Sequence, residues 1–280
     1  MIGLMREGAM KKQDHQTYEV IDVDETNKGE YCVCLEGWSD EIIEAGDRKC
    51  HWYEYMKDRG LGVKLIKDTE GVISGMIQYI PAEYAPLSGK DFYFIHCIWI
   101  HGHKKGIGDK RRVGMGTVLL EVAEEDMRER GASGIACWGV SMPIWMKASW
   151  YKKHGYEIIE KEGMRCLLWK PLKDDAVPPK WYKLSPIESP ERGVVVTSIV
   201  NGICPVTNLV NVRAKEVSQE FGDDVSFREI VTQDPEVMYR WGASDALLIN
   251  SKEIPLGPPL SKKKIRKTIQ KQLKKVLVKR

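Results

Sequence analysis

The chain has 280 residues, of which 42% are hydrophobic and 30% are charged, and its formal net charge is +3. This length suits one large domain or two ordinary domains, and the apolar content is sufficient for a buried core. No run of about 18 apolar residues occurs, and the N-terminal residues lack the apolar centre of a secretion signal. We therefore expect a cytoplasmic protein without a membrane span.

The first half of the chain alternates between strand-like and helix-like segments. In chain order we expect a strand at 18–23, helices within 29–59, strands at 63–68 and 72–80 joined by a hairpin turn, a long strand at 92–100, a helix after residue 114, a strand at 133–140, a short helix within 145–157 and a closing strand at 164–172. The helical region 29–59 contains Glu41, Glu44 and Glu54, which either attract a cationic amine or form a solvated helix face.

A glycine-rich stretch between the long strand and the helix that follows carries the clearest chemical signal. It reads R-x-x-G-x-G-T and consists of Arg111, Arg112, Val113, Gly114, Met115, Gly116 and Thr117. Glycine lets the backbone approach a ligand closely, and the free N–H groups at a helix start bind anions. The pattern predicts a pyrophosphate site, although an ordinary turn before a helix has the same appearance. The spacing is not the G-x-G-x-x-G of dinucleotide-binding folds.

A second pattern follows about 35 residues later, where Trp150, Tyr151, His154, Gly155 and Tyr156 form W-Y-x-x-H-G-Y. With the order of elements given above, the two patterns resemble the GNAT N-acetyltransferases over roughly residues 17–172. The resemblance implies an α/β (α+β) fold with a mixed central sheet and flanking helices. It also implies acetyl-CoA as co-substrate and transfer of its acetyl group to an amine.

In this family the acyl-CoA lies where the fourth and fifth strands part, here 92–100 and 133–140. The resemblance therefore implies backbone contacts to the pantetheine arm at Ile98, Trp99 and Ile100, contacts to the pyrophosphate at 111–117, and protonation of the leaving thiolate by Tyr151. His96 is the candidate base or substrate contact, but strict alternation places it on one face with Phe92, Phe94, Ile98 and Ile100, where a core histidine is the more common case. His103, Lys104 and Lys105 either contact phosphates or lie in solvent.

The second half of the chain begins after residues 173–193, which contain four prolines and many charges and are typical of a linker. A strand at 194–200, a Cys-Pro turn, a helix, a strand at 225–232, a short helix and a strand with a turn at 246–254 then follow. This order resembles a small thioredoxin-like fold, and its position behind the first domain resembles the YoaP-like acetyltransferases. We expect an extension at 1–16, a GNAT domain at 17–172, a linker at 173–193 and a thioredoxin-like domain at 194–280 that serves recognition or dimerisation.

The chain ends in residues 261–280, which contain ten Lys/Arg and no acidic residue, against 33 basic and 40 acidic residues in the rest. Such a segment can bind nucleic acid or a membrane surface. Its apolar residues recur at helical spacing, however, and favour a terminal helix that packs one face on its domain and leaves the lysines in solvent. These residues are Ile265, Ile269, Leu273, Val276 and Leu277. We therefore expect neither a nucleic acid nor a membrane as partner.

Cys204 is the candidate thiol site of the second domain. It precedes Pro205 at a helix start, where the helix dipole lowers the pKa of a thiol. A dithiol redox site needs a second cysteine at the fourth position, which is Thr207 here. A thiol-dependent or redox-linked protein acting through Cys204, and a non-catalytic CoA-binding protein, are the alternatives to an acetyltransferase. The cysteines show no paired CxxC spacing, so we expect no metal. The acceptor and the oligomeric state, a homodimer included, stay open.

Overall fold

The computed structural model describes residues 10–13, 16–142, 146–190 and 193–278. The described chain forms two compact units. Unit 1 comprises Met1–Trp38 and Met56–Trp181, and unit 2 comprises Ser39–Tyr55 and Tyr182–Arg280, each as far as it is described. The chain therefore enters unit 2 after Trp38 and returns to unit 1 at Met56. The boundaries drawn from the sequence were consecutive, whereas these units are not. Of the expected extension at 1–16, residues 1–9 and 14–15 lie outside the described residues.

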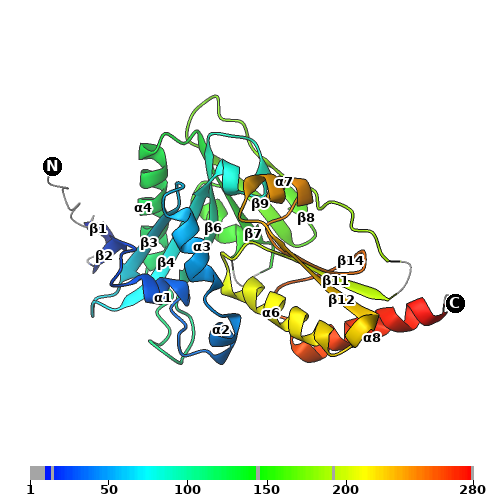
Figure 1. The fold of residues 1–280 in the computed structure, drawn as a ribbon. Coiled ribbons are helices and arrows are strands. Elements are labelled where there is room, and N and C mark those ends of the chain that lie inside the picture. The colour runs from blue at the N-terminus through cyan, green and yellow to red at the C-terminus, as the bar shows by residue number, and fades with distance from the viewer. Residues whose placement is uncertain (1–9, 14–15, 143–145, 191–192, 279–280) are drawn as a thin grey trace. The chain divides into compact units, whose positions relative to one another are not determined.

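Unit 1 is built on an eight-stranded mixed sheet of order β1-β2-β3-β4-β6-β7-β9-β8 (Figure 1). Its strands are β1 (Met10–Gln13), β2 (Gln16–Asp22), β3 (Gly62–Lys67), β4 (Ile73–Pro81), β6 (Phe92–Ile100), β7 (Gly134–Val140), β8 (Glu157–Glu162) and β9 (Arg165–Pro171). The pair β6–β7 is parallel and the other neighbours are antiparallel. The mixed central sheet expected from the sequence is confirmed.

A small second sheet in unit 1 pairs β5 (Leu87–Ser88) with β10 (Lys180–Trp181). Trp181 is buried, and its backbone N–H donates a hydrogen bond to the Glu160 carboxylate at 3.1 Å. The guanidinium of Arg165 lies 4.2 Å from the centre of the Trp181 ring. The first part of the expected linker is therefore an ordered strand of unit 1.

Helices cover both faces of the large sheet. They are α1 (Lys28–Cys32), α4 (Met115–Glu129) and α5 (Ala148–Lys153), and η1 (Ala82–Tyr84) is a short 3-10 helix. The apolar stripe of α4 packs on β2, β3, β4 and β6, where Ile77 and Tyr79 belong to the shared core. Gln78 lies between these two residues and therefore points to the opposite face. There its Oε1 accepts a hydrogen bond from the hydroxyl of Tyr31 in α1 at 2.7 Å.

Unit 2 contains a four-stranded sheet of order β12-β11-β13-β14. The strands are β11 (Val194–Val200), β12 (Val225–Val231), β13 (Ala246–Ile249) and β14 (Lys252–Ile254). The helices of this part of the chain are α2 (Asp40–Ala45), α3 (Arg48–Met56), α6 (Pro205–Gln219), η2 (Gly222–Asp224), α7 (Pro235–Trp241) and α8 (Lys262–Val278). Strand β11 is parallel to β12 and antiparallel to β13, which is antiparallel to β14.

The core of unit 2 has two sides. Helices α6 and α8 share one core with Val196, Leu247 and Ile249. On the other side, residues of α7 pack against Ile199 and Leu248. Ile265 and Ile269 are 1% and 0% exposed, so the prediction of a terminal helix that buries one apolar face is confirmed. A thioredoxin-like identity for this unit stays a prediction.

Candidate active site

Strands β6 and β7 pair as parallel neighbours and then part. Their pairing runs from Phe92↔Gly134 to Ile95↔Cys137, but β6 continues to Ile100 and β7 to Val140. Beyond the last pair the two strands share no ladder, so the facing edge of β6 offers backbone donors and acceptors to a ligand. At the start of this stretch the Trp138 indole reaches from β7 and donates a hydrogen bond to the His96 carbonyl oxygen at 2.7 Å.

Strand β6 contains a β-bulge at the point where β7 leaves it. Tyr79 of β4 pairs with Ile95 and Gln78 pairs with Cys97, so His96 is the extra residue between these pairs. Ile98 packs on the α4 core together with Ile95, whereas the His96 ring lies 6.2 Å from the ring of Phe94.

The expectation that His96 shares a face with Ile98 and Ile100 is therefore wrong. The bulge inserts one residue, and every later side chain of β6 changes face relative to strict alternation. His96 stays with Phe94, while Ile98 and Ile100 join the core under α4. The histidine thus lies outside the large apolar core, at the place where the sheet opens.

The glycine-rich loop ends at the start of α4. Gly114 is the N-cap, with φ 88° and ψ −14°, a left-handed conformation that favours glycine. Its carbonyl oxygen accepts hydrogen bonds from the N–H groups of Thr117 at 2.9 Å and Val118 at 3.2 Å. The N–H groups of Met115 and Gly116 precede the first intrahelical bonds and point out of the helix. Together with the helix dipole, such N–H groups are suited to an anion, and an anion site here stays a prediction.

Two further contacts define this loop. The Tyr18 hydroxyl donates a hydrogen bond to the Val113 carbonyl oxygen at 2.7 Å and ties the loop to β2. A Cβ added at Gly116 would lie 3.7 Å from Trp150 Cζ2 and 3.8 Å from Ile100 Cγ1, which is ordinary van der Waals contact. The packing of the protein itself therefore does not require glycine at 116. A ligand seated on the helix N-terminus would require it.

Two cations of the loop, Lys110 and Arg111, are already engaged with carboxylates. Arg111 donates two hydrogen bonds to Asp109, at 2.8 and 2.7 Å, and these bonds hold the pKa of Asp109 far below its usual range. The Lys110 ammonium lies 2.6 Å from Asp68. Arg112 is exposed and has a left-handed φ of 70°. A bound phosphate would therefore compete with Asp109 for the guanidinium of Arg111.

Tyr151 is fully buried beneath the place where the strands part. Its exposed fraction is 0%, and its hydroxyl donates to the Met146 sulfur at 3.9 Å. Burial, and then the nearby Cys137 and Cys97, raise the pKa of Tyr151 well above its ordinary value. Cys137 forms the last β6–β7 pair and Cys97 lies beyond it on β6. The phenol therefore keeps its proton, and a role for it as a proton donor stays a prediction.

The structure adds Trp150 and His154 to the residues expected at this site. The His154 Nδ1 lies 2.9 Å from the Trp150 carbonyl oxygen, which only accepts, so the proton is on Nδ1. The Nε2 then accepts a hydrogen bond from the Thr117 hydroxyl at 3.2 Å. The two sequence patterns meet through this contact. The W-Y-x-x-H-G spacing contains the signal, since it places Trp150 and His154 one helical turn apart.

The loop between β6 and α4 packs against the segment that follows α1. His101 is buried, its Nδ1 donates to the Gly108 carbonyl oxygen at 2.7 Å, and its Nε2 accepts from the Trp38 indole at 3.2 Å. The His103 Nε2 lies 3.4 Å from a Glu36 carboxylate oxygen, and the Lys105 ammonium lies 5.9 Å from the centre of the Trp38 ring. In this structure His103 and Lys105 therefore contact neighbouring side chains.

A cavity of about 420 Å³ lies beside this loop. Its lining is mostly glycine and aliphatic side chains, with the Trp38 indole on one side; Val33, Leu35, Trp38, Ile73 and Ile107 are among the residues that form it. We call it the Trp38 cavity. Its volume lies within the range of small-molecule sites.

Cys204 lies at the N-cap of α6, with Pro205 at the first helical turn. It is a free thiol of intermediate exposure. The hydroxyl of Thr207, at the fourth position, donates to the Cys204 carbonyl oxygen at 3.0 Å. Asp245 lies nearby in this corner of unit 2 and accepts a hydrogen bond from the Asn201 N–H at 3.3 Å. A chemical role for Cys204 stays a prediction.

Two absences apply to the part of the chain that the structure describes. Within it, no group of three or more His, Cys, Asp and Glu side chains is arranged to hold a metal ion. Among the helices of the same residues, none is long and apolar enough to cross a membrane.

Comparisons with known proteins point in the direction of the sequence resemblance. No family model matches the chain. The chain is 22% identical over 184 residues to the protein "Uncharacterized N-acetyltransferase YoaP" of Bacillus subtilis (strain 168), covering 63% of this chain and 69% of that protein. The PaiA N-acetyltransferase of Thermoplasma acidophilum, solved with coenzyme A, gives 15% identity and a TM-score of 0.40, with 55% of this chain and 98% of that chain covered. A GNAT acetyltransferase of Brucella melitensis, solved with acetyl-CoA, gives 12% identity and a TM-score of 0.41, covering 60% and 97%.

TM-scores of this size do not establish a common fold, so the assignment depends on the sequence relative and on the site itself. The parting of β6 and β7 after Ile95, the glycine-capped start of α4 at Gly114, and the buried Tyr151 occur in the order that the sequence resemblance implies. The chain is therefore similar, in sequence and in the order of these features, to the GNAT N-acetyltransferases.

Proposed function

We propose that this protein transfers an acetyl group from acetyl-CoA to a primary amine, by direct attack of the amine on the thioester. The observation that carries the proposal is the end of β6–β7 pairing at Ile95↔Cys137. From there the free edge of β6 leads to Ile100, which lies against Gly116 at the start of α4. An extended arm with a phosphate group at its end fits this path. The Bacillus relative is named as an N-acetyltransferase, which supports the same reaction.

Acetyl-CoA supplies an activated acetyl thioester at one end of a long arm and a pyrophosphate near the other. We propose that the main chain at Ile98, Trp99 and Ile100 pairs with the arm, as strand residues do with an added strand. The backbone N–H groups from Val113 to Thr117 would hold the pyrophosphate, and Arg111 and Arg112 would neutralise its charge.

Tyr151 is the proposed general acid. As the new C–N bond forms and the C–S bond breaks, its phenol gives a proton to the sulfur, and it regains that proton from solvent. The ordinary pKa values of a thiol and a phenol lie within about two units of each other, so this proton transfer is accessible when it is concerted with cleavage of the C–S bond. The raised pKa of Tyr151 keeps the phenol protonated until that moment. The attacking amine loses its proton to His96, or to a water chain that starts there, and the bulge of β6 brings this histidine to the opening of the sheet.

For unit 2 we propose a thioredoxin-like module that serves acceptor recognition or dimerisation. The order strand, helix, strand, helix, two strands and helix supports this, as does a sheet in which β11 lies between the parallel β12 and the antiparallel β13. Dithiol chemistry is disfavoured because Thr207 occupies the position of a second cysteine.

The proposal is tested by the release of CoA from acetyl-CoA in the presence of a panel of primary amines, using the full chain. We expect Tyr151→Phe to lower kcat by about a hundredfold or more and to leave acetyl-CoA binding unchanged. The matched control is Tyr156→Phe, since Tyr156 is 1% exposed in the same core and its ring lies 5.4 Å from that of Tyr151. An equal loss in both variants would contradict the role of Tyr151.

The two alternatives, a non-catalytic CoA-binding protein and a thiol-dependent protein, predict different results. Tight binding of acetyl-CoA without transfer to any amine would support a non-catalytic CoA-binding protein. A folded protein that binds no acetyl-CoA would overturn the acetyltransferase proposal. A glutathione mixed disulfide at Cys204 that forms rapidly and reversibly would then favour thiol chemistry.

A further inference from the structure

Helix α2 lies in the first half of the sequence but belongs to unit 2. It packs against α6, and yet it has almost no apolar surface with which to do so. Ala45 is its one buried residue, and Ile43 is 66% exposed. A helix this short is not stable by propensity alone. Polar contacts with α6 therefore supply much of what holds it in place.

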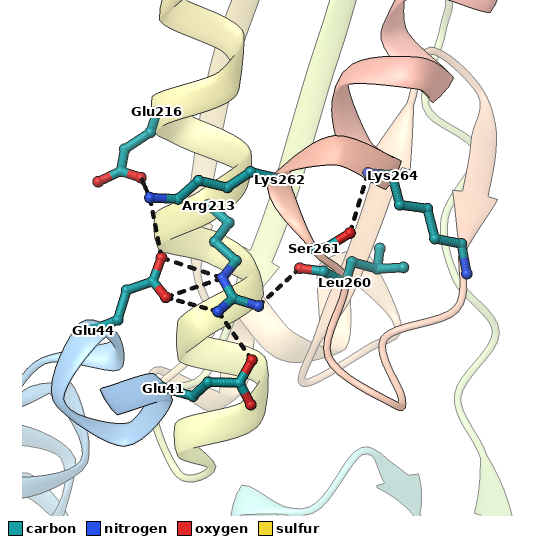
Figure 2. A network of polar contacts seen from close by, with 8 residues as sticks. All are labelled: Glu41, Glu44, Arg213, Glu216, Leu260, Ser261, Lys262 and Lys264. Carbon is teal, nitrogen blue, oxygen red and sulfur yellow. Dashed lines mark hydrogen bonds and ion pairs between the residues drawn. The ribbon is translucent and has the colours of Figure 1, made fainter. Parts of the chain in front are cut away.

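Arg213 of α6 supplies most of these contacts (Figure 2). Its guanidinium donates to both carboxylate oxygens of Glu44, at distances between 2.7 and 3.2 Å, and to Glu41 at 3.0 Å. The remaining Nη1 donates to the Leu260 carbonyl oxygen at 3.2 Å, in the segment just before α8. One planar side chain thus ties together α2, α6 and the segment that leads into α8. A fork of fixed geometry suits this use better than a lysine ammonium.

The surroundings make this guanidinium hard to replace. The Arg213 side chain is 10% exposed, whereas Glu44 and Glu41 are 27% and 55% exposed. Lys262 bridges Glu44 at 3.1 Å and Glu216 at 2.7 Å, so two cations face three carboxylates. Loss of Arg213 would leave the acidic side in excess, and breaking a largely buried pair costs more than the pair contributes in net stability. The carboxylates of Glu41 and Glu44 are therefore both already paired with cations of unit 2, although Glu41 stays half-exposed.

The segment before α2 forms part of the wall of the Trp38 cavity. The carbonyl oxygen of Ser39, the N-cap of α2, accepts from Ile42 and Ile43 at 3.0 Å each. Trp38, immediately before Ser39, lines the cavity and donates to His101. Cys34 and Leu35 have left-handed φ values of 51° and 62°, a strained conformation for such residues that persists only where the ends of a segment are fixed.

We propose that Arg213 is a positioning residue that anchors α2 on α6 and, through the Trp38–Ser39 peptide bond, fixes the shape of the segment 33–38 at the Trp38 cavity. The N-terminal end of this segment is hydrogen-bonded to α1, where the Val33 N–H donates to the Gly29 carbonyl oxygen at 3.3 Å. Its C-terminal end is held at Trp38 by His101 in unit 1 and continues into α2, which the Arg213 fork holds in unit 2. The C-terminal part of the chain would thereby control the form of a cavity built from N-terminal residues. This inference does not depend on the acetyl-transfer reaction.

Hydrogen–deuterium exchange of the full chain tests the proposal. In Arg213→Ala we expect amides of residues 40–45 to exchange about tenfold faster or more, residues 33–38 to follow them, and α4 to stay as in the wild type. Arg213→Lys keeps the charge but loses the fork, and should lie between the two. The matched control is Arg266→Ala, since Arg266 forms a similar double hydrogen bond with Glu220 across α6 and α8 but does not contact α2.

Three results would overturn the proposal. One is equal exchange of 40–45 in the Arg213 and Arg266 variants, and another is a released α2 with residues 33–38 unchanged. If Arg213→Ala does not fold, Glu44→Ala with Glu41→Ala removes the contacts of the fork to α2 from the more exposed side, leaves the one to Leu260, and should give the same pattern. The third overturning result would be wild-type exchange in that double variant. The swap Arg213→Glu with Glu44→Arg should restore part of the protection, which a change due only to lost packing would not do.

Discussion

Gly116→Ala should distinguish the effect of this glycine on protein stability from its effect on ligand binding. The new methyl group would lie 3.7 Å from Trp150 and 3.8 Å from Ile100, so it clashes with nothing in the protein. Alanine in a helix is more favourable than glycine by up to about 1 kcal/mol. We therefore expect the free energy of unfolding to stay the same or to rise by up to that amount.

Binding of acetyl-CoA should change in the opposite direction. The methyl group would occupy the place beside the first-turn N–H groups of α4, where we propose that the pyrophosphate lies. Loss of one hydrogen bond to a charged group costs about 1.5–3 kcal/mol, which corresponds to a rise of about tenfold to a hundredfold in Kd. Calorimetric titration gives Kd, and denaturant unfolding of the same samples gives stability.

Gly131→Ala is the control for this experiment. Gly131 has φ 84° and no atom within 4 Å of an added Cβ, so the substitution strains the backbone at the end of α4 by about 1 kcal/mol without touching the site. It should lower stability and leave Kd unchanged. Wild-type affinity in Gly116→Ala would refute the placement of the phosphate at this helix start.

Two further predictions concern charges near the loop. Asp109→Asn frees Arg111 from its double hydrogen bond, so acetyl-CoA should bind several-fold more tightly at low salt. The gain in affinity should shrink at higher salt, which screens the charges. Titrations at two salt concentrations test this, and weaker binding in the variant would count against competition between Asp109 and phosphate. Burial raises the pKa of Asp68, but hydrogen bonds from Lys110, Val72, Glu70 and Ser74 outweigh burial and lower it to about 2. Because the pKa of Asp68 is lower in the folded than in the unfolded protein, these hydrogen bonds add about 2 kcal/mol to the free energy of unfolding above about pH 4. This contribution is lost as the pH falls toward about 2. Acid titration of Asp68→Asn should therefore lack this part of the decline in stability.

Apolar runs were the most predictable features of the fold. The strands 92–100 and 194–200 agree with β6 and β11 in both bounds, because long apolar runs are buried whatever their neighbours are. The phase of side chains along β6 was not predictable. FYFIHCIWI has too little alternation between polar and apolar residues to reveal an inserted residue, so the bulge at His96 left no trace in the sequence.

The position of α2 was not predictable for a different reason. Glu41 and Glu44 look like an ordinary solvated face, and their partner Arg213 follows about 170 residues later. Pairing over such a distance leaves no local periodicity. The glycine-rich start of α4 was predictable because Gly114 needs a left-handed φ, a requirement that lies in one residue. The contact of His154 was not predictable, because its hydrogen bond to Thr117 joins two patterns that lie about 35 residues apart in the chain.

The crystal structure of the full chain with acetyl-CoA would test the central claim most directly. We predict that the pantetheine arm lies along the edge of β6 beyond the Ile95↔Cys137 pair, with the pyrophosphate on the N–H groups at the start of α4 and the sulfur within reach of the Tyr151 hydroxyl. Acetyl-CoA bound elsewhere, with β6 and β7 closed on each other and the α4 start empty, would contradict the account.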